Sequence, residues 1–167
     1  YYISMGIPSY FSYIVKNHPD IILEYDIFTQ KYIIDNLYLD SNSIIYDCLR
    51  VLEKKHDQLI GKQKNISKSK FELQLIKAVC LKINFYIEII NPRKKVMIAF
   101  DGSVPLAKMD QQRQRRYKSQ LEDKIRQALP NYKEKIWNKT VITPGTEFMN
   151  LLDEKIKKYY ETIYKKE

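Results

Sequence analysis

The sequence has 167 residues, enough for one domain with a hydrophobic core. Apolar residues make up 44% and charged residues 29%, an ordinary globular composition, and no apolar run reaches the roughly 18–20 residues that a membrane-spanning helix needs. The 29 Lys and Arg residues against 20 Asp and Glu residues leave a formal charge of +9. This excess favours a polyanionic partner, nucleic acid first and an anionic membrane second. A basic surface without a partner is the alternative.

The first predicted element is a helix within residues 7–19. Pro8 stands near its first turn and Pro19 just past its end, the two places where a helix best accommodates proline. Met5 has the character of a natural start, so we expect the domain to cover residues 5–167, with residues 1–4 as an extension ahead of it. The apolar N-terminal stretch lacks a basic region and a small-residue cleavage site, so we do not expect a signal peptide.

A short apolar strand is predicted over residues 33–40, and it ends on Asp40. Residues 41–55 begin with Ser and Asn, which cap helices well, and then follow a helical apolar pattern. Residues 56–70 are rich in Lys, Ser and Asn with little periodicity, so we expect a surface loop there.

A long helix is predicted over residues 70–92, because its apolar residues recur at helical spacing until Pro92 ends the pattern. Residues 94–101 form the second predicted strand, which ends on Asp101. A turn then leads into a long polar helix over residues 106–129.

The last part of the sequence predicts a short strand or extended piece that leads into a turn over residues 140–148, and a final amphipathic helix over 147–166. Helices that alternate with strands predict an α/β fold with a mainly parallel sheet flanked by helices. The predicted strands are few for a stable sheet, so we expect the chain to be the N-terminal portion of something longer.

Two cysteines and two histidines limit the chemistry of the chain. Cys48 and Cys80 both fall in apolar helical patterns, which predicts buried free thiols in a reducing compartment. His18 and His56 are too few for a histidine-based metal site or triad, so we expect each to be structural or solvated. No localisation signal stands out, and we expect a cytoplasmic protein, with a nuclear one as the alternative.

Asp40 and Asp101 are the first candidate site residues. Ligands of parallel α/β sheets bind beyond the carboxyl ends of the strands, and a long crossover between these two strands allows them to be parallel neighbours. Two adjacent carboxylates repel unless a cation lies between them, and oxygen ligands without histidine favour Mg²⁺ or Mn²⁺. The alternative is that each aspartate merely begins a turn or caps a helix.

The polar helix carries a second candidate site. Lys108, Gln112, Arg115 and Arg116 are spaced so that they share one helix face. Arginine binds phosphate oxygens in a bidentate fork, lysine adds a point charge and glutamine adds a neutral hydrogen bond. This row predicts a binding site for a terminal phosphate beside Asp101, whereas a solvated helix is the alternative.

At these residues the chain resembles the 5′→3′ exoribonucleases of the XRN family, from Met5 onward over essentially its whole length. Four stretches carry the resemblance, namely "MGIPSYFSYI", "DNLYLDSNSIIYDC", "IAFDGSVPLAKMDQQRQRRYKS" and "VITPGTEFMNLL". The resemblance implies a nuclease core of the PIN/flap-endonuclease kind. It also implies processive degradation of single-stranded RNA from a 5′-monophosphate end, with release of mononucleotides and dependence on a divalent metal, Mg²⁺ or Mn²⁺.

The resemblance also assigns roles to single residues. It implies that Asp40 and Asp101 are catalytic carboxylates and metal ligands, and that Ser41 and Asn42 shape the site. It implies 5′-phosphate binding by the four residues of the polar helix named above. Tyr46 replaces the family's base-stacking histidine, and a tyrosine can still stack on a base.

Two further departures from the family bear on activity. Asp110 stands where the family usually has asparagine, and its charge weakens phosphate binding if it faces the pocket. The remaining acidic residues of the family lie downstream of Glu167, so we expect the chain alone to hold only part of the metal site.

Three functional hypotheses follow. The first is the N-terminal part of an active exoribonuclease, with the remainder of the nuclease on the same or another chain. The second is a truncated, non-catalytic module that binds RNA 5′ ends or a protein partner. The third is a DNA-directed relative of the flap-endonuclease kind, which the stretch "AKMDQQRQRR" disfavours.

Overall fold

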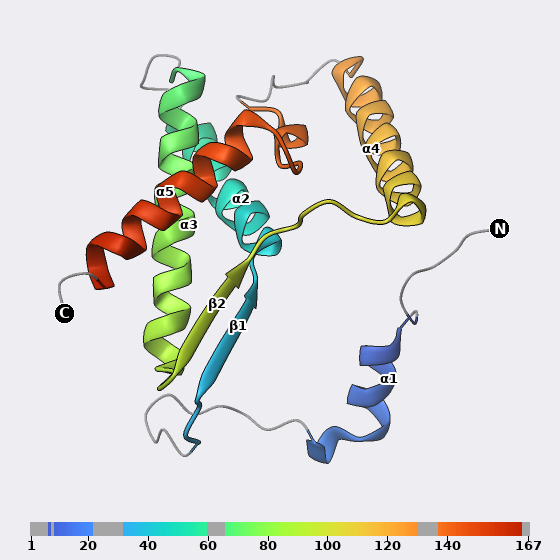
Figure 1. The fold of residues 1–167 in the computed structure, drawn as a ribbon. Coiled ribbons are helices and arrows are strands. Elements are labelled where there is room, and N and C mark those ends of the chain that lie inside the picture. The colour runs from blue at the N-terminus through green and yellow to red at the C-terminus, as the bar shows by residue number, and fades with distance from the viewer. Residues whose placement is uncertain (1–6, 8, 22–31, 60–65, 130–136, 165–167) are drawn as a thin grey trace.

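The structure is a computed structural model that describes residues 7, 9–21, 32–59, 66–129 and 137–164 (Figure 1). Its elements are, in chain order, α1 (Tyr10–Asn17), η1 (Pro19–Ile21), β1 (Asn36–Asp40), α2 (Asn42–Leu59), α3 (Lys68–Ile90), β2 (Lys95–Ala99), α4 (Leu106–Gln127), η2 (Lys139–Val141) and α5 (Glu147–Tyr164). The mixed α/β class is therefore confirmed. No described helix is both long and apolar enough to cross a membrane.

The two described strands pair in parallel, as the sequence predicts. Their register runs from Asn36 opposite Lys95 to Asp40 opposite Ala99. The backbone N–H of Ser41 extends the ladder by donating to the Ala99 carbonyl at 2.8 Å. Parallel pairing requires a long crossover, and α2 and α3 supply it.

The sheet has one covered face and one open face among the described residues. Leu39 and Ile98 pack against the hydrophobic core, because neighbouring parallel residues in register point to the same side. Tyr38 and Met97 point the other way and are 61% and 48% exposed. Asp40 is on this open side, since it is two residues beyond Tyr38.

The core lies between α2, α3 and α5, with α3 at its centre (Figure 1). The apolar stripe predicted for the long helix is buried where α2 and α5 cover it. The buried core residues are Ile44, Ile45, Cys48, Leu49, Phe71, Leu75, Ile76, Val79, Cys80, Ile83, Trp137, Ile142, Phe148, Met149, Leu152 and Ile156. Both cysteines are free and buried, which confirms the predicted burial of two free thiols.

Trp137 joins three separate parts of the chain. Its indole N–H donates to a carboxylate oxygen of Glu72 at 3.0 Å. Its ring lies 4.9 Å from that of Phe148, edge to face, and 5.9 Å from that of Phe71. The start of α3, the segment before η2 and the start of α5 are therefore held together around one aromatic side chain.

The predicted loop over residues 56–70 is wrong at both ends. The α2 helix continues to Leu59, and α3 begins at Lys68, so only its middle is left between the helices. Residues 60–65 of that prediction lie outside the described part. A contact of His56 explains why α2 continues. Its ring lies 5.6 Å from that of Phe71 on α3, and this tertiary contact stabilises the additional helical turn.

The short strand or extended piece predicted within residues 140–148 is also wrong, whereas the turn predicted after it is confirmed at residues 144–145. Residues 139–141 form the η2 turn, and the chain then enters α5 at Glu147. Hydroxyl groups stabilise the turn, because Thr143 Oγ1 donates to the Thr140 carbonyl at 2.7 Å and Thr146 Oγ1 donates to the Val141 carbonyl at 2.6 Å. Gly145 has φ of 84°, which a β-branched or bulky residue adopts only with strain.

The α4 helix stands apart from the bundle of α2, α3 and α5 (Figure 1). Several of its apolar side chains are exposed, among them Leu106 at 74%, Leu121 at 60% and Ile125 at 59%. Its polar composition suits this position, because little of its surface is buried by the described residues.

Candidate functional site

Asp40 and Asp101 lie at the same edge of the sheet, as their strands predict. Asp40 is the last residue of β1, and Asp101 follows the end of β2 by two residues. Because the strands run in parallel, both carboxylates stand at the carboxyl ends, where α/β proteins bind ligands. Both side chains are exposed, which keeps them open to a ligand.

Asn42 fixes the position of Asp101. Its Nδ2 donates to Asp101 Oδ2 at 2.8 Å, and its Oδ1 accepts from the Asp101 backbone N–H at 3.1 Å. The start of α2 is therefore tied directly to the exit from β2. Ser41, the residue between Asp40 and Asn42, is fully buried, and its hydroxyl donates to the Leu39 carbonyl at 3.4 Å.

A pocket of about 270 Å³ lies between α2, α4 and η2, and we call it the Tyr46 pocket. It contains two of the four residues predicted to bind phosphate, Arg115 and Arg116. Lys108 and Gln112 lie one to two turns earlier on α4 and are not part of its lining. The lining residues are Tyr46, Arg115, Arg116, Ser119, Lys139, Thr140, Ile142 and Thr143.

Tyr46 connects the pocket to the carboxylate edge. Its side chain is 40% exposed, so one part of the ring is available to a ligand. Partial burial raises the pKa of the Tyr46 phenol above its ordinary value; the nearby Arg116 charge opposes this rise and the Asp101 charge adds to it. The phenol is therefore neutral at physiological pH, and Asp101 and Arg116 both lie close enough to influence it electrostatically.

Sequence reasoning missed one side of the Tyr46 pocket. Thr140 and Thr143 belong to a segment that the sequence predicts as extended chain, and Lys139 comes directly before it. Ser119 lies one turn beyond the arginine row. Their only sequence signal is the basic and hydroxyl-bearing composition of the stretch before Pro144. Their position beside Tyr46 depends on how η2 folds back toward α4.

Asp110 does not oppose the arginines of the pocket. Its Oδ1 lies 3.6 Å from Nη1 of Arg113, three residues later on the same helix. Both side chains are 61% exposed, so the pair is solvated and contributes little to stability. Asp110 therefore pairs with Arg113 on its own helix and not with Arg115 or Arg116 of the Tyr46 pocket.

The described residues offer only part of a metal site. Within them, no group of three or more His, Cys, Asp or Glu side chains lies close enough to hold a metal ion. Asp40 and Asp101 provide two carboxylates at one edge, and Mg²⁺ is often bound by one or two carboxylates with water and substrate phosphates completing its shell. The two carboxylates therefore fit a hard divalent cation such as Mg²⁺, to which the protein would supply few of the ligands.

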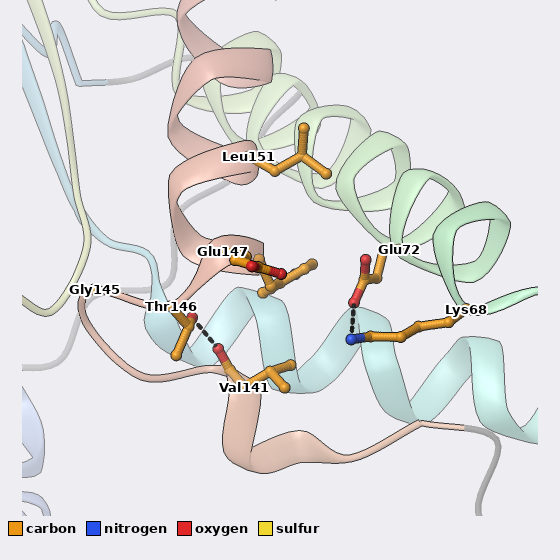
Figure 2. Close-up of a pocket in the computed structure, with 8 residues that line it drawn as sticks. Lys68, Glu72, Val141, Gly145, Thr146, Glu147 and Leu151 are labelled. Carbon is orange, nitrogen blue, oxygen red and sulfur yellow. Dashed lines mark hydrogen bonds and ion pairs between the residues drawn. The ribbon is translucent and has the colours of Figure 1, made fainter.

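A second pocket, of about 600 Å³, lies away from these residues, where α5 begins beside α3 (Figure 2). Lys68 and Glu72, one turn apart on α3, line it and form an ion pair of 3.9 Å between Nζ and Oε1 (Figure 2). Thr146 and Val141 form its lower wall through the hydroxyl–carbonyl hydrogen bond seen in Figure 2. None of the predicted site residues lines this pocket.

Comparison with known proteins identifies the family of the chain. The family model described as "XRN 5'-3' exonuclease N-terminus" matches residues 5–167. The 5'-3' exoribonuclease 1 of Saccharomyces cerevisiae is 35% identical over 91% of this chain and 10% of its own length. The 5'-3' exoribonuclease 1 of Homo sapiens is 35% identical over 92% of this chain and 9% of its own length.

The 5'-3' exoribonuclease 2 of Saccharomyces cerevisiae is 29% identical over 96% of this chain and 18% of its own length. The chain thus matches only 9% to 18% of the length of these three curated relatives. Because the family model matches nearly every residue, the chain belongs to the XRN 5′-3′ exonuclease N-terminus family.

Proposed function

We propose that the protein containing this chain is a 5′→3′ exoribonuclease that processively degrades single-stranded RNA with a 5′-monophosphate and releases mononucleotides. The names of the relatives, 5'-3' exoribonuclease 1 and 2, support the reaction class. The net charge of +9 supports a polyanionic substrate.

The observation that carries the proposal is the Tyr46 pocket beside Asp101. Arg115 and Arg116 supply the planar donors that suit phosphate oxygens, and Tyr46 supplies a ring on which the terminal base stacks. Asp101 stands next to this arrangement at the sheet edge, held by Asn42. A phosphate fixed in the pocket sets the register of the strand, so that cleavage falls one nucleotide from the end.

We propose that Lys108 and Gln112 extend the phosphate-binding row along α4. Both side chains are partly buried, whereas Arg115 and Arg116 are more exposed. In this proposal Lys108 and Gln112 contact the RNA strand between the Tyr46 pocket and Asp101. They lie near the start of α4, which begins shortly after Asp101 in the chain.

Asp40 and Asp101 would hold the divalent cation, Mg²⁺ or Mn²⁺, through carboxylate oxygens. Such a cation supplies charge stabilisation at the scissile phosphodiester and an activated water. Asn42 contributes by keeping the Asp101 carboxylate oriented, which reduces the cost of arranging the ligands during the reaction.

A non-catalytic module that binds RNA 5′ ends or a protein partner is the second candidate. The observation in its favour is that the described residues gather two carboxylates at the sheet edge and no cluster of three. In that case the pocket binds an RNA end, and the chain alone does not cleave it.

The test is digestion of one single-stranded RNA sequence carrying a 5′-monophosphate, a 5′-hydroxyl or a 5′-triphosphate, with Mg²⁺ and with EDTA. The 167-residue chain is tested beside the longest natural polypeptide that contains it. A DNA of the same sequence with a 5′-monophosphate serves as the control for a DNA-directed nuclease.

Loss of the monophosphorylated RNA alone, only with Mg²⁺ and only in the longer polypeptide, is the expected result. Preferential binding of that RNA without cleavage by either form would establish the binding module instead. Digestion of all three RNAs at the same rate would contradict recognition of the terminal phosphate. Digestion of the DNA at the rate of the monophosphorylated RNA would contradict the ribonuclease assignment.

A further inference from the structure

Lys139 forms a part of the Tyr46 pocket that the arginine row does not reach. Arg115 and Arg116 come from α4, whereas Lys139 comes from η2, which precedes α5. Three cationic side chains from two separate elements therefore line one pocket of about 270 Å³. That volume is near the lower limit of about 300 Å³ for pockets that bind small molecules, which suits part of a nucleotide.

The backbone that carries Lys139 is held firmly. The side chain of Asn138 accepts a hydrogen bond from the Thr140 N–H at 3.0 Å, and Thr143 Oγ1 donates to the Thr140 carbonyl at 2.7 Å. Trp137 and Ile142, on either side of η2, are only 4% and 5% exposed. Ordering Lys139 on a ligand therefore costs only side-chain entropy, because its backbone is already fixed.

None of the three cations forms an ion pair within the described part of the chain. The contrast is Arg113 on the same helix, which pairs with Asp110 at 3.6 Å. Lys139, Arg115 and Arg116 instead line one pocket together with the uncharged residues Ser119 and Thr140. Like charges around one space repel, so the arrangement favours an anion between them.

We propose that Lys139 is a specificity-determining residue that binds the terminal phosphate of the RNA from η2, while Arg115 and Arg116 bind it from α4. This inference rests on the proposed function, since it requires the RNA 5′ end to enter the Tyr46 pocket. A terminal phosphate monoester carries about −1.5 to −2 charges at pH 7, more than an internal diester. A third cation therefore adds more to the binding of a monophosphate end than to the binding of an internal phosphate.

The experiment uses the natural polypeptide that contains this chain, with Lys139→Gln, Lys139→Arg and the control Lys158→Gln. Lys158 is exposed on α5 outside the pocket, so its substitution removes the same charge from elsewhere. Binding is measured in EDTA for one RNA with a 5′-monophosphate or a 5′-hydroxyl end, over a series of salt concentrations.

We expect Lys139→Gln to weaken binding of the monophosphorylated RNA by about tenfold, the loss typical of one charge-assisted contact. Binding of the hydroxyl RNA and of both RNAs to Lys158→Gln should change less than about twofold. The salt slope for the monophosphorylated RNA should fall by about one, and Lys139→Arg should restore most of the affinity.

An equal loss on both RNA ends would overturn the inference, because Lys139 would then contact an internal phosphate. Identical behaviour of Lys139→Gln and Lys158→Gln would overturn it as well. The unsubstituted protein tests the proposed function separately: if it binds both ends equally, the end recognition itself fails, whatever the variants do.

Discussion

Asn42 holds Asp101 through both ends of its amide, one contact to the carboxylate and one to the backbone. Only a group that donates and accepts at once can make this pair of contacts. An aspartate in its place would accept only, and it would put a second negative charge beside Asp101. The amide of Asn42 therefore orients the Asp101 carboxylate and adds no second negative charge at the sheet edge.

We predict that Asn42→Ala and Asn42→Asp each lower kcat/KM on monophosphorylated RNA by about tenfold or more, because Asp101 loses a charge-assisted hydrogen bond. Ser43→Ala is the matched control, since Ser43 is the exposed neighbour on the first turn of α2. Wild-type activity in both Asn42 variants would show that the cleavage site does not depend on this contact.

Tyr46 offers a ring and not a charge. Because burial raises the pKa of its phenol, the hydroxyl stays protonated between pH 6 and the ordinary tyrosine pKa of about 10. We predict that Tyr46→Phe leaves RNA affinity within about twofold across pH 6 to 9, whereas Tyr46→Ala weakens it by about tenfold through lost stacking. A pH-dependent loss in Tyr46→Phe, measured by fluorescence anisotropy of labelled RNA, would contradict a stacking role.

Among the helices, α3 is the central element of the core. Its periodicity was sufficient to predict a helix and its buried stripe, since the buried side chains recur three and four residues apart. The stripe also includes Phe71 and Leu75, near the polar stretch that the sequence presents as a loop. Their burial comes from contacts with other elements, including the Trp137 ring against Phe71, which no local pattern contains.

We predict that Leu75→Ala lowers the free energy of unfolding by about 2–5 kcal/mol, because the side chain is fully buried and its removal leaves a cavity. Leu81→Ala on the same helix is the control, with a side chain 54% exposed and an expected loss under about 1 kcal/mol. Urea denaturation followed by circular dichroism measures both. Similar losses of unfolding free energy in the two variants would mean that the α3 face with Leu75 does not point into the core.

The elements that carry the candidate site differ in how well the sequence predicts their positions. Two strands that end on aspartate and are joined by a long crossover were enough to predict a shared edge, because parallel strands align their carboxyl ends. The arginine row followed from helical spacing alone. The position of Lys139 did not, because hydroxyl–carbonyl hydrogen bonds around Thr143 and Thr146 shape the turn before α5, and these form only in the folded chain.

On the scale of the whole molecule, charge and core are separated. The covered face of the sheet and the three-helix core contain the buried apolar residues, while α4 and the open sheet edge carry the polar site. Cys48 on α2 and Cys80 on α3 lie inside that core. Burial raises the pKa of both thiols; Lys82 opposes the rise at Cys48, and a backbone hydrogen bond opposes it at Cys80.

We predict that the chain loses stability as the pH rises above about 8.5, the ordinary thiol pKa. Above that value the unfolded chain releases thiol protons that the folded chain retains, so the unfolded state binds fewer protons and the free energy of unfolding falls with pH. Below it this contribution is fully present. Urea titrations at pH 7.5 and 9.5, with reductant, should show a smaller pH dependence in Cys48→Ala/Cys80→Ala than in the unsubstituted chain. An unchanged pH dependence would mean that other groups cause the loss.

The contacts of Trp137 give the molecule an internal optical reporter. Trp137 is the single tryptophan of the sequence, and it stands two residues before Lys139 with its indole N–H bound to Glu72. Indole emission responds to polarity and hydrogen bonding, so any ligand that shifts η2 changes the fluorescence of the unlabelled protein. Titration with a short monophosphorylated oligonucleotide would then follow movement of this side of the pocket in real time, without a dye and without cleavage.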